Sequence, residues 1–244
     1  MSILLVSLVL PLVGGRPDLG SILWGLAAGV AGGLAVWWFY AALADGPMAV
    51  VSPITAVLVA GIPVLVGLGL GERPGAPAIG GIALALIGVL LVSRESPGEA
   101  TDSSGPRFNR RVALLTVGSG LAYGFAFVFL HETSGGSGLW PLLAQRLAAT
   151  AVVWVMALSA GEFRAVRGKP LRLAAYISVL DVISNAALLY AFHGSLLSLV
   201  SVLGSLYPAA TVLLAMVLLG EQVRRSQQFG LLLALGAVAL IAVG

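Results

Sequence analysis

The amino-acid sequence predicts an all-α membrane protein of about nine transmembrane helices, eight full and one partial, arranged as two inverted repeats. Three observations carry this prediction: an apolar composition, a series of long apolar segments, and a pattern that occurs once in each half of the chain. The helices are expected, in order, near residues 2–13, 20–43, 47–70, 76–93, 111–131, 139–160, 173–193, 195–219 and 227–244.

The composition excludes a soluble domain. Of 244 residues, 59% are hydrophobic and 9% are charged, and the mean hydropathy is +1.05. Soluble domains carry about 25% charged residues, so these charges cannot cover a water-facing surface. The basic pI rests on a net charge of only +3, spread between apolar segments, which does not indicate nucleic-acid binding. The absence of cysteine excludes a disulfide framework and a thiolate metal site.

The first apolar segment differs from the others. Residues 2–13 are too few to cross a bilayer alone, which takes about 20 residues. They also lack the basic start and the cleavage site of a signal peptide. We therefore expect the second half of a helix here, and a first repeat that lacks its opening helix.

A polar linker divides the two repeats. The stretch from Ser93 to Arg111 is rich in proline, glycine and serine, which disfavour a packed element. The predicted organisation is a first repeat at 1–93, a linker at 94–110 and a complete second repeat at 111–244. Five helices per repeat would invert the second copy relative to the first. Most lysines and arginines fall in one set of loops, which the positive-inside rule places in the cytoplasm.

The duplicated pattern supports this division. Tyr40 and Tyr190 each begin a Tyr-Ala pair, followed by a polar turn and a long apolar segment that ends in Leu-Gly-Glu. The spacing from tyrosine to glutamate is 32 residues to Glu72 and 31 residues to Glu221. We expect both glutamates to lie at the membrane interface and to position turns.

Glycines predict where helices approach closely. Gly25, Gly29 and Gly33 recur at every fourth position, as do two pairs, Gly67 with Gly71 and Gly120 with Gly124. In lipid, such small-residue faces allow close contact between helix backbones.

Two charged residues inside apolar segments are candidates for function, because a charge in the membrane is costly. Asp181 lies one helical turn before Asn185, so both project from one face. Arg146 follows Gln145 in the preceding helix. One hypothesis places these four residues on a polar cavity, where Asp181 binds a proton or a cationic group. The alternatives are a structural ion pair between Asp181 and Arg146, or an Arg146 side chain that extends to the membrane interface.

Aromatic residues supply further candidates. Trp38, Tyr40 and Tyr190 are consistent with the lining of a pocket for an organic substrate, and equally with interfacial anchors. Tyr123 lies beside the Gly120–Gly124 pair and faces either a helix contact or a cavity. The motifs of metalloproteases, serine hydrolases and phosphate-binding loops are absent from the sequence, so no catalytic, metal-binding or cofactor-binding residue is predicted.

Several of these residues resemble a known family. The segment from Ser205 through Pro208 to Ala215, then Leu219-Gly220-Glu221 and Gln228-Phe229-Gly230, is similar to the end of an EamA domain of the drug/metabolite transporter superfamily. The segment from Trp140-Pro141 to Gln145-Arg146 resembles that family's Pro…Arg segment. The resemblance covers 20–93 and 111–244, although Val59 stands where a proline is expected. It implies ten helices as two inverted EamA repeats, around a central substrate cavity.

The resemblance implies a secondary transporter, an efflux permease for small metabolites such as amino acids, working by alternating access in the bacterial inner membrane. The alternatives are a non-transporting membrane scaffold or a truncated paralogue that pairs with another chain, and, third, an intramembrane enzyme. The expected partners are the lipid bilayer, a small-molecule substrate and a coupling ion, either a proton or sodium. A homodimer is one further option, and neither nucleic acid nor a cofactor is expected.

Overall fold

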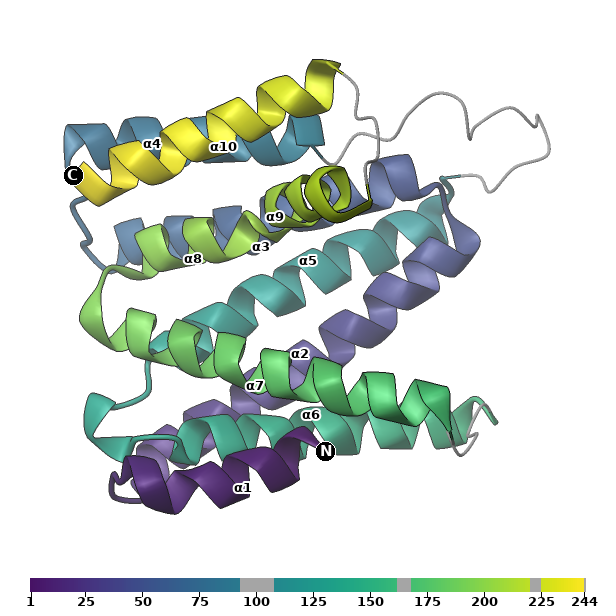
Figure 1. The fold of residues 1–244 in the computed structure, drawn as a ribbon, viewed down its shortest axis with the longest axis vertical. Helices are drawn as coiled ribbons and strands as arrows, with labels where there is room; N and C mark the ends of the chain where they lie inside the picture. The colour runs from purple at the N-terminus through teal and green to yellow at the C-terminus, as the bar shows by residue number, and fades with distance from the viewer. Residues whose placement is uncertain (93–107, 162–167, 220–224, 244) are drawn as a thin grey trace. The chain divides into compact units, whose positions relative to one another are not determined.

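Every regular element in the described residues is a helix. The structure, a computed structural model, describes residues 1–92, 108–161, 168–219 and 225–243 (Figure 1). Its elements are α1 (Ser2–Val13), α2 (Leu19–Asp45), α3 (Met48–Gly69), α4 (Ala76–Val92), α5 (Arg110–His131), the short 3₁₀ helix η1 (Gly135–Ser137), α6 (Trp140–Ser159), α7 (Lys169–Gly194), α8 (Leu197–Ser205), α9 (Tyr207–Leu214), the π-helix η2 (Ala215–Leu219) and α10 (Arg225–Val243).

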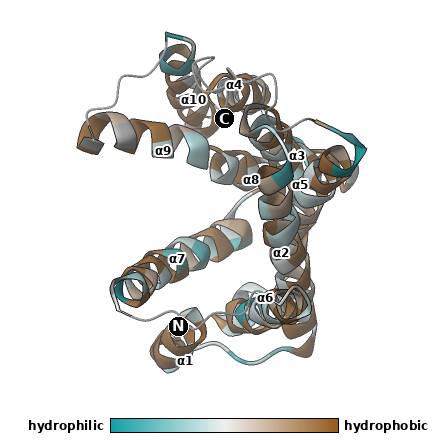
Figure 2. Cartoon of the chain, turned by 90° about the vertical axis from the view of Figure 1, so that its right-hand side faces the viewer, coloured by the Kyte–Doolittle hydropathy of each residue, from teal (hydrophilic) through white to brown (hydrophobic). Residues whose placement is uncertain are grey.

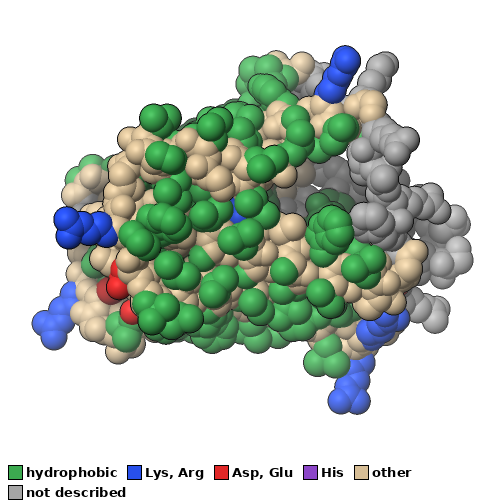
Figure 3. Space-filling view, turned by 90° about the horizontal axis from the view of Figure 1, so that it is seen from below, with side chains coloured by type: hydrophobic (Ala, Val, Ile, Leu, Met, Phe, Trp, Pro, Cys, Tyr) green, Lys and Arg blue, Asp and Glu red, His purple; other side chains and the backbone are tan. Residues whose placement is uncertain are grey.

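The helices have the length and hydrophobicity of membrane spans. In the described part of the chain, seven spans are long and apolar enough to cross a bilayer, and α1 and α4 are shorter apolar helices. Figure 2 shows hydrophobic residues around most of each helix. The space-filling view in Figure 3 shows a face covered by hydrophobic side chains, with lysine and arginine towards its ends. On α1, for example, Leu4, Leu8 and Leu12 are 74%, 72% and 84% exposed. The all-helical membrane fold predicted from composition is confirmed.

The chain folds as two compact units. Unit 1 comprises residues 1–37 and 125–195, and unit 2 comprises residues 38–124 and 196–244. Each unit therefore contains parts of both halves of the sequence. The boundaries run within α2 and α5 and between α7 and α8.

Unit 1 is organised by the close approach of α2 to α6. A Cβ atom added at Gly29 would lie 2.8 Å from the Cβ of Ala148, and one at Gly33 would lie 2.9 Å from the Cβ of Val152. Gly25 approaches the α6 backbone in the same way. The predicted three-glycine ridge is therefore a helix contact, and its missing side chains are what permit the short distance.

The start of α2 is fixed by a local cap. The Asp18 carboxylate accepts hydrogen bonds from the backbone N–H and the hydroxyl of Ser21, both at 2.8 Å. These bonds, the backbone one first, lower the pKa of Asp18 from its ordinary value, because they stabilise the charged form. The Ser21 hydroxyl in turn accepts from the backbone N–H of Ser134, which ties the loop after α5 to α2.

Unit 2 pairs equivalent helices of the two repeats. In it α3 packs against α8, and α4 lies beside α10 (Figure 1). The α4–α10 contact is reciprocal. A Cβ at Gly81 would meet Ile241, and a Cβ at Gly230 would meet Val92. When Glu72 is aligned with Glu221, Gly81 corresponds to Gly230 and Val92 corresponds to Ile241. The same contact is therefore made twice, as a two-fold relation between antiparallel helices requires.

The second glycine pair on α5 also makes a helix contact. A Cβ at Gly120 would lie 2.6 Å from the Cβ of Leu58, and one at Gly124 would lie 2.8 Å from the Cβ of Ile62. Both partners belong to α3. The first part of α5, which lies in unit 2, therefore packs closely on α3.

The pair Gly67 and Gly71 corrects the expectation of a third helix contact. Gly71 has a positive φ of 94° and ends α3, with backbone bonds from Gly71 to Leu68 and from Glu72 to Gly67 that close the last turn. Gly67 makes room for a side chain, since a Cβ there would lie 2.7 Å from the Cδ of Glu72. The four-residue spacing arose from a turn and a folded-back carboxylate, which a spacing rule does not distinguish from a ridge.

Glu72 caps a helix far away in the sequence. Its carboxylate accepts hydrogen bonds from the backbone N–H groups of Leu197 and Ser198, the latter at 3.0 Å. These are the first residues of α8, whose own N-cap residue, Leu196, supplies no side-chain bond. A carboxylate at this position satisfies free N–H groups and complements the helix dipole. The glutamate expected to position a turn thus connects one repeat to the other.

The predicted helix at 195–219 is interrupted. α8 ends at Ser205 and α9 begins at Tyr207, beside Pro208, before the π-helical turn η2. This agrees with a proline that bends the span. The linker predicted at 94–110 falls mainly, and Glu221 entirely, outside the described residues.

The glycine ridge on α2 can be tested with two glycine-to-alanine substitutions on the same helix, which should affect stability differently. Replacing Gly29 by alanine inserts a Cβ into α6, and overpacking typically costs about 1–3 kcal/mol. At Gly32 nothing lies within 4 Å of an added Cβ. We expect Gly29→Ala to lower the thermal unfolding midpoint in detergent and Gly32→Ala to leave it unchanged or raise it. Equal midpoints for the two variants would contradict the α2–α6 contact.

The Glu72 cap generates a second stability test. We expect Glu72→Ala to cost about 1–2 kcal/mol, the usual value for loss of a helix N-cap. Glu72→Gln should cost less than Glu72→Ala, because the glutamine side chain keeps one of the two acceptor oxygens and the alanine side chain keeps neither. Glu132→Ala, at an exposed glutamate after α5, is the control. Denaturant unfolding of the purified chain measures all three, and a Glu72→Ala variant as stable as Glu132→Ala would exclude the cap.

Candidate functional site

Arg146 and Asp181 form an ion pair between two membrane-spanning helices. Nη1 of Arg146 on α6 lies 3.0 Å from Oδ2 of Asp181 on α7. The Arg146 side chain is 18% exposed and the Asp181 side chain 36% exposed, so the first is largely covered and the second partly exposed. Both charges lie within spans of 20 or more mainly apolar residues. Pairing lowers the cost of placing either charge there.

The Asp181 carboxylate is held from several sides. The side-chain amide of Asn185, one turn further along α7, donates to Oδ1 at 3.0 Å and to the Asp181 backbone carbonyl at 2.8 Å. The hydroxyl of Ser2 on α1 lies 3.4 Å from Oδ2. Both oxygens of the carboxylate therefore have a donor within reach. Ser2 was not predicted, because nothing in the local sequence links it to a residue 179 positions away.

The Arg146 guanidinium, in contrast, is only partly used. Its Nε and Nη2 atoms are buried and have no hydrogen-bond partner among the described residues. The side-chain oxygen of the neighbouring Gln145 is likewise buried and unpartnered. The backbone carbonyl of Gln145 is the group that Gly29 approaches. The glycine ridge on α2 thus sets the position of the α6 turn that carries Arg146.

Tyr190 lies elsewhere on α7. It is 45% exposed, and its ring packs edge-on against His193. His193 is hydrogen-bonded through Nε2 to the hydroxyl of Thr133, at 2.9 Å. Phe192, which lies between Tyr190 and His193 in the chain, packs against His131. Tyr190 therefore belongs to an aromatic and histidine group at the end of α7, nine residues beyond Asp181.

The other three aromatic candidates lie in unit 2. Trp38 packs on Gly118, where an added Cβ would lie 3.3 Å from the indole ring. Tyr40 is 66% exposed, as expected of an anchor, and its ring meets Phe39 edge-on. Tyr123 is half-buried beside the α5–α3 contact. Of the eight predicted site residues, Arg146, Asp181 and Asn185 are joined by direct contacts, and Gln145 adjoins Arg146 in the chain. Tyr40 and Tyr123 are close enough to interact electrostatically in unit 2.

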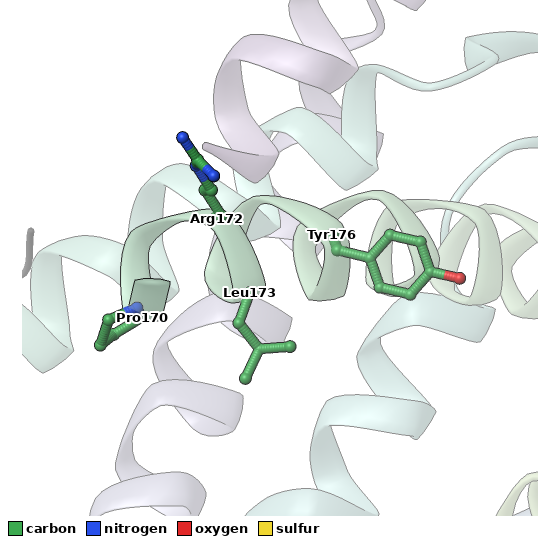
Figure 4. A pocket seen from close by; sticks show the side chains of 4 residues that line it. All are labelled: Pro170, Arg172, Leu173 and Tyr176. Atoms are coloured by element: carbon green, nitrogen blue, oxygen red, sulfur yellow. The ribbon is translucent and has the colours of Figure 1, made fainter. Parts of the chain in front are cut away.

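Two pockets occur away from the Arg146–Asp181 pair. One, of about 590 Å³, is an open hollow along the start of α7, lined by Pro170, Arg172, Leu173 and Tyr176 (Figure 4). The other, of about 210 Å³, is an apolar groove between α10 and the α8–α9 region. Neither is lined by a predicted site residue. Within the described residues, no three histidine, aspartate or glutamate side chains gather as a metal site would require.

These features define a class: a polytopic helical membrane protein with two interleaved repeats and a charged pair inside its spans. The model of the EamA-like transporter family matches residues 1–94 and 110–243. The chain therefore belongs to the EamA-like transporter family, a membrane transporter family of the drug/metabolite transporter superfamily.

Solved structures support the fold. Eleven chains of solved structures match this chain. One, described only as the crystal structure of a protein, is similar with a TM-score of 0.66 and 16% sequence identity. The match covers 99% of this chain and 94% of that one. No curated protein matches by sequence. The structural likeness concerns the fold alone, and residue roles rest on the geometry of this chain.

The ion pair generates a test by double-mutant cycle. Removing one partner of a buried pair typically costs about 3–5 kcal/mol, and partial exposure should reduce this to about 1–3 kcal/mol here. We expect Arg146→Gln and Asp181→Asn each to lower stability, and the double variant to lose less than the sum. The control cycle uses Arg111 and Asp45, whose side chains are 76% and 41% exposed. In this pair Nη1 of Arg111 lies 3.4 Å from Oδ2 of Asp45. Its coupling should stay below about 1 kcal/mol. Equal coupling in both cycles would contradict a buried pair.

Proposed function

We propose that the chain is a secondary transporter that moves small metabolites, such as amino acids or related organic compounds, across the bacterial cell membrane. We favour export as the direction and alternating access as the mechanism. The observation that carries the proposal is the ion pair between Arg146 and Asp181 inside two membrane-spanning helices of a transporter-family protein.

Charged residues within membrane spans support a role in moving solutes or ions, because they are retained despite their cost. An ion pair with only a structural role does not need unpaired donors, and could have every donor and acceptor satisfied within the protein. Among the described residues, both oxygens of Asp181 have donors, whereas two donors of Arg146 have no acceptor. Alternating access also requires parts of the protein that rearrange, and the chain divides into two compact units.

In the proposed mechanism, Asp181 accepts a proton and Arg146 interacts with the substrate. Protonation of Asp181 removes its charge and weakens its attraction to Arg146. The guanidinium, which stays charged, is then available to another partner. A proton gradient across the membrane can in this way be coupled to movement of a metabolite. Asn185 acts as a positioning residue, because its amide holds the Asp181 carboxylate.

The test is flux in proteoliposomes containing the full chain. A mixture of isotope-labelled amino acids is loaded, a pH gradient is imposed, and efflux is measured by mass spectrometry. We expect Asp181→Asn to reduce coupled flux at least tenfold and to remove its dependence on pH. Asp45→Asn is the matched control, because Asp45 pairs with Arg111 at the ends of its helices.

Unchanged, pH-dependent flux in Asp181→Asn would exclude the coupling role of Asp181. If the unsubstituted chain gives no flux above empty liposomes, transport by this chain alone is excluded. Purification of the chain with a stoichiometric partner would then favour a membrane subunit.

A further inference from the structure

Arg146 presents an unused hydrogen-bonding edge. Asp181 contacts only Nη1, whereas Nε and Nη2 are buried and have no partner among the described residues. In a guanidinium group, Nη1 is the nitrogen cis to Cδ, so Nε–H and one N–H of Nη2 lie on the opposite edge and point the same way. Two parallel donors at this spacing match the two oxygens of a carboxylate. The unpartnered atoms are thus one complete bidentate edge.

The neighbouring groups do not complete this edge. The carboxylate of Asp181 is engaged through both oxygens, with Asn185 on one and Ser2 and Arg146 on the other. The side-chain oxygen of Gln145 is an acceptor without a partner among the described residues, so it is not bonded to the guanidinium. Buried donors without partners are rare in folded proteins because water is lost without replacement. An external acceptor is therefore the natural partner of this edge.

We propose that the Nε/Nη2 edge of Arg146 binds the carboxylate of a small organic acid, which is the anionic group of the substrate. This deepens the proposed transport function and rests on it. Nε and Nη2 are buried in this structure, so the acid reaches them only when the helices around them separate. A carboxylate is favoured over a neutral group because bidentate recognition uses both of its charged oxygens.

Charge balance links this site to the proton. Arg146 and Asp181 together carry no net charge, and a bound monocarboxylate leaves one negative charge inside the spans. Protonation of Asp181 restores neutrality, so the acid and the proton each favour binding of the other. The groups that face Asp181 are few. From α6 it meets Arg146. On the side of α1 there is no titratable side chain, but the α-amino group of Met1 directly precedes Ser2, whose hydroxyl reaches Asp181. On α7, the nearest charged residue is Arg172, nine positions earlier.

The experiment follows the Arg146 side chain directly. The full chain is labelled with ¹⁵N-arginine in nanodiscs of phosphatidylcholine, which contain no anionic lipid, and the Arg146 Nε–H signal is assigned by its loss in Arg146→Lys. The probe is acetate, with chloride at equal ionic strength and acetamide as the neutral analogue. We expect a saturable shift with acetate only. Arg110, exposed at the start of α5, serves as an internal control.

The charge at position 181 separates a carboxylate site coupled to Asp181 from simple attraction to an arginine. Acetate binding is compared between variants at pH 7, where acetate is ionised. Asp181→Asn, which mimics the protonated acid, should bind acetate more tightly than the unsubstituted chain, because the negative charge beside the site is removed.

Three results would overturn the proposal: no saturable Arg146 shift with acetate, an equal shift with acetamide, or weaker acetate binding in Asp181→Asn. If that variant fails to fold, the comparison of acetate with acetamide on the unsubstituted chain decides the anion site. Acetate binding without flux in liposomes would retain the anion site and reject transport. Equal flux of carboxylates and their amides would retain transport and reject the anion site.

Discussion

Close backbone contact between α2 and α6 is the constraint on which the candidate site depends. Apolar burial does not hold helices together in lipid, because the acyl chains are as apolar as the side chains. Contact distance is then set by what lies between the backbones, and on α2 this is a row of glycines. Gly29 meets the backbone of Gln145, the residue before Arg146. The guanidinium is thereby held at the depth and rotation at which its Nη1 reaches Asp181.

The same constraint explains which parts of the fold could be predicted. Composition and segment length identify the spans, since a bilayer demands about 20 apolar residues per helix. The ridges at Gly25–Gly33 and Gly120–Gly124 were read correctly, because a helix contact needs small residues on one face. Gly67 and Gly71 show the same spacing but end a helix and accommodate Glu72. Spacing alone does not separate these cases, since the deciding fact is the φ angle of Gly71 and the direction of one side chain.

The site was predicted as a set of residues and not as an arrangement. A charge inside an apolar segment is visible in the sequence, so Arg146 and Asp181 could both be found, and their pairing was one of the hypotheses left open. Which atoms pair depends on the rotation of α6 and α7, and therefore on contacts with α1 and α2 that no local pattern encodes. The aromatic candidates show the opposite case. Tyr40 and Tyr190 occupy equivalent places in the two repeats, yet they lie in different units, because the units do not follow the repeat boundary.

The Glu72 cap and the Arg146–Asp181 pair therefore have different roles. Glu72 is saturated by the N–H groups that it caps and joins the two repeats within unit 2, so it has little capacity to respond to a ligand. The Arg146–Asp181 pair is asymmetric, with a fully engaged carboxylate and a partly engaged guanidinium. A proton that binds to Asp181 removes the charge of its carboxylate, and an anion that binds to Arg146 accepts hydrogen bonds from its unpaired donors. A pair of this kind has two arrangements of similar charge balance, which is the property that coupling between two ligands requires.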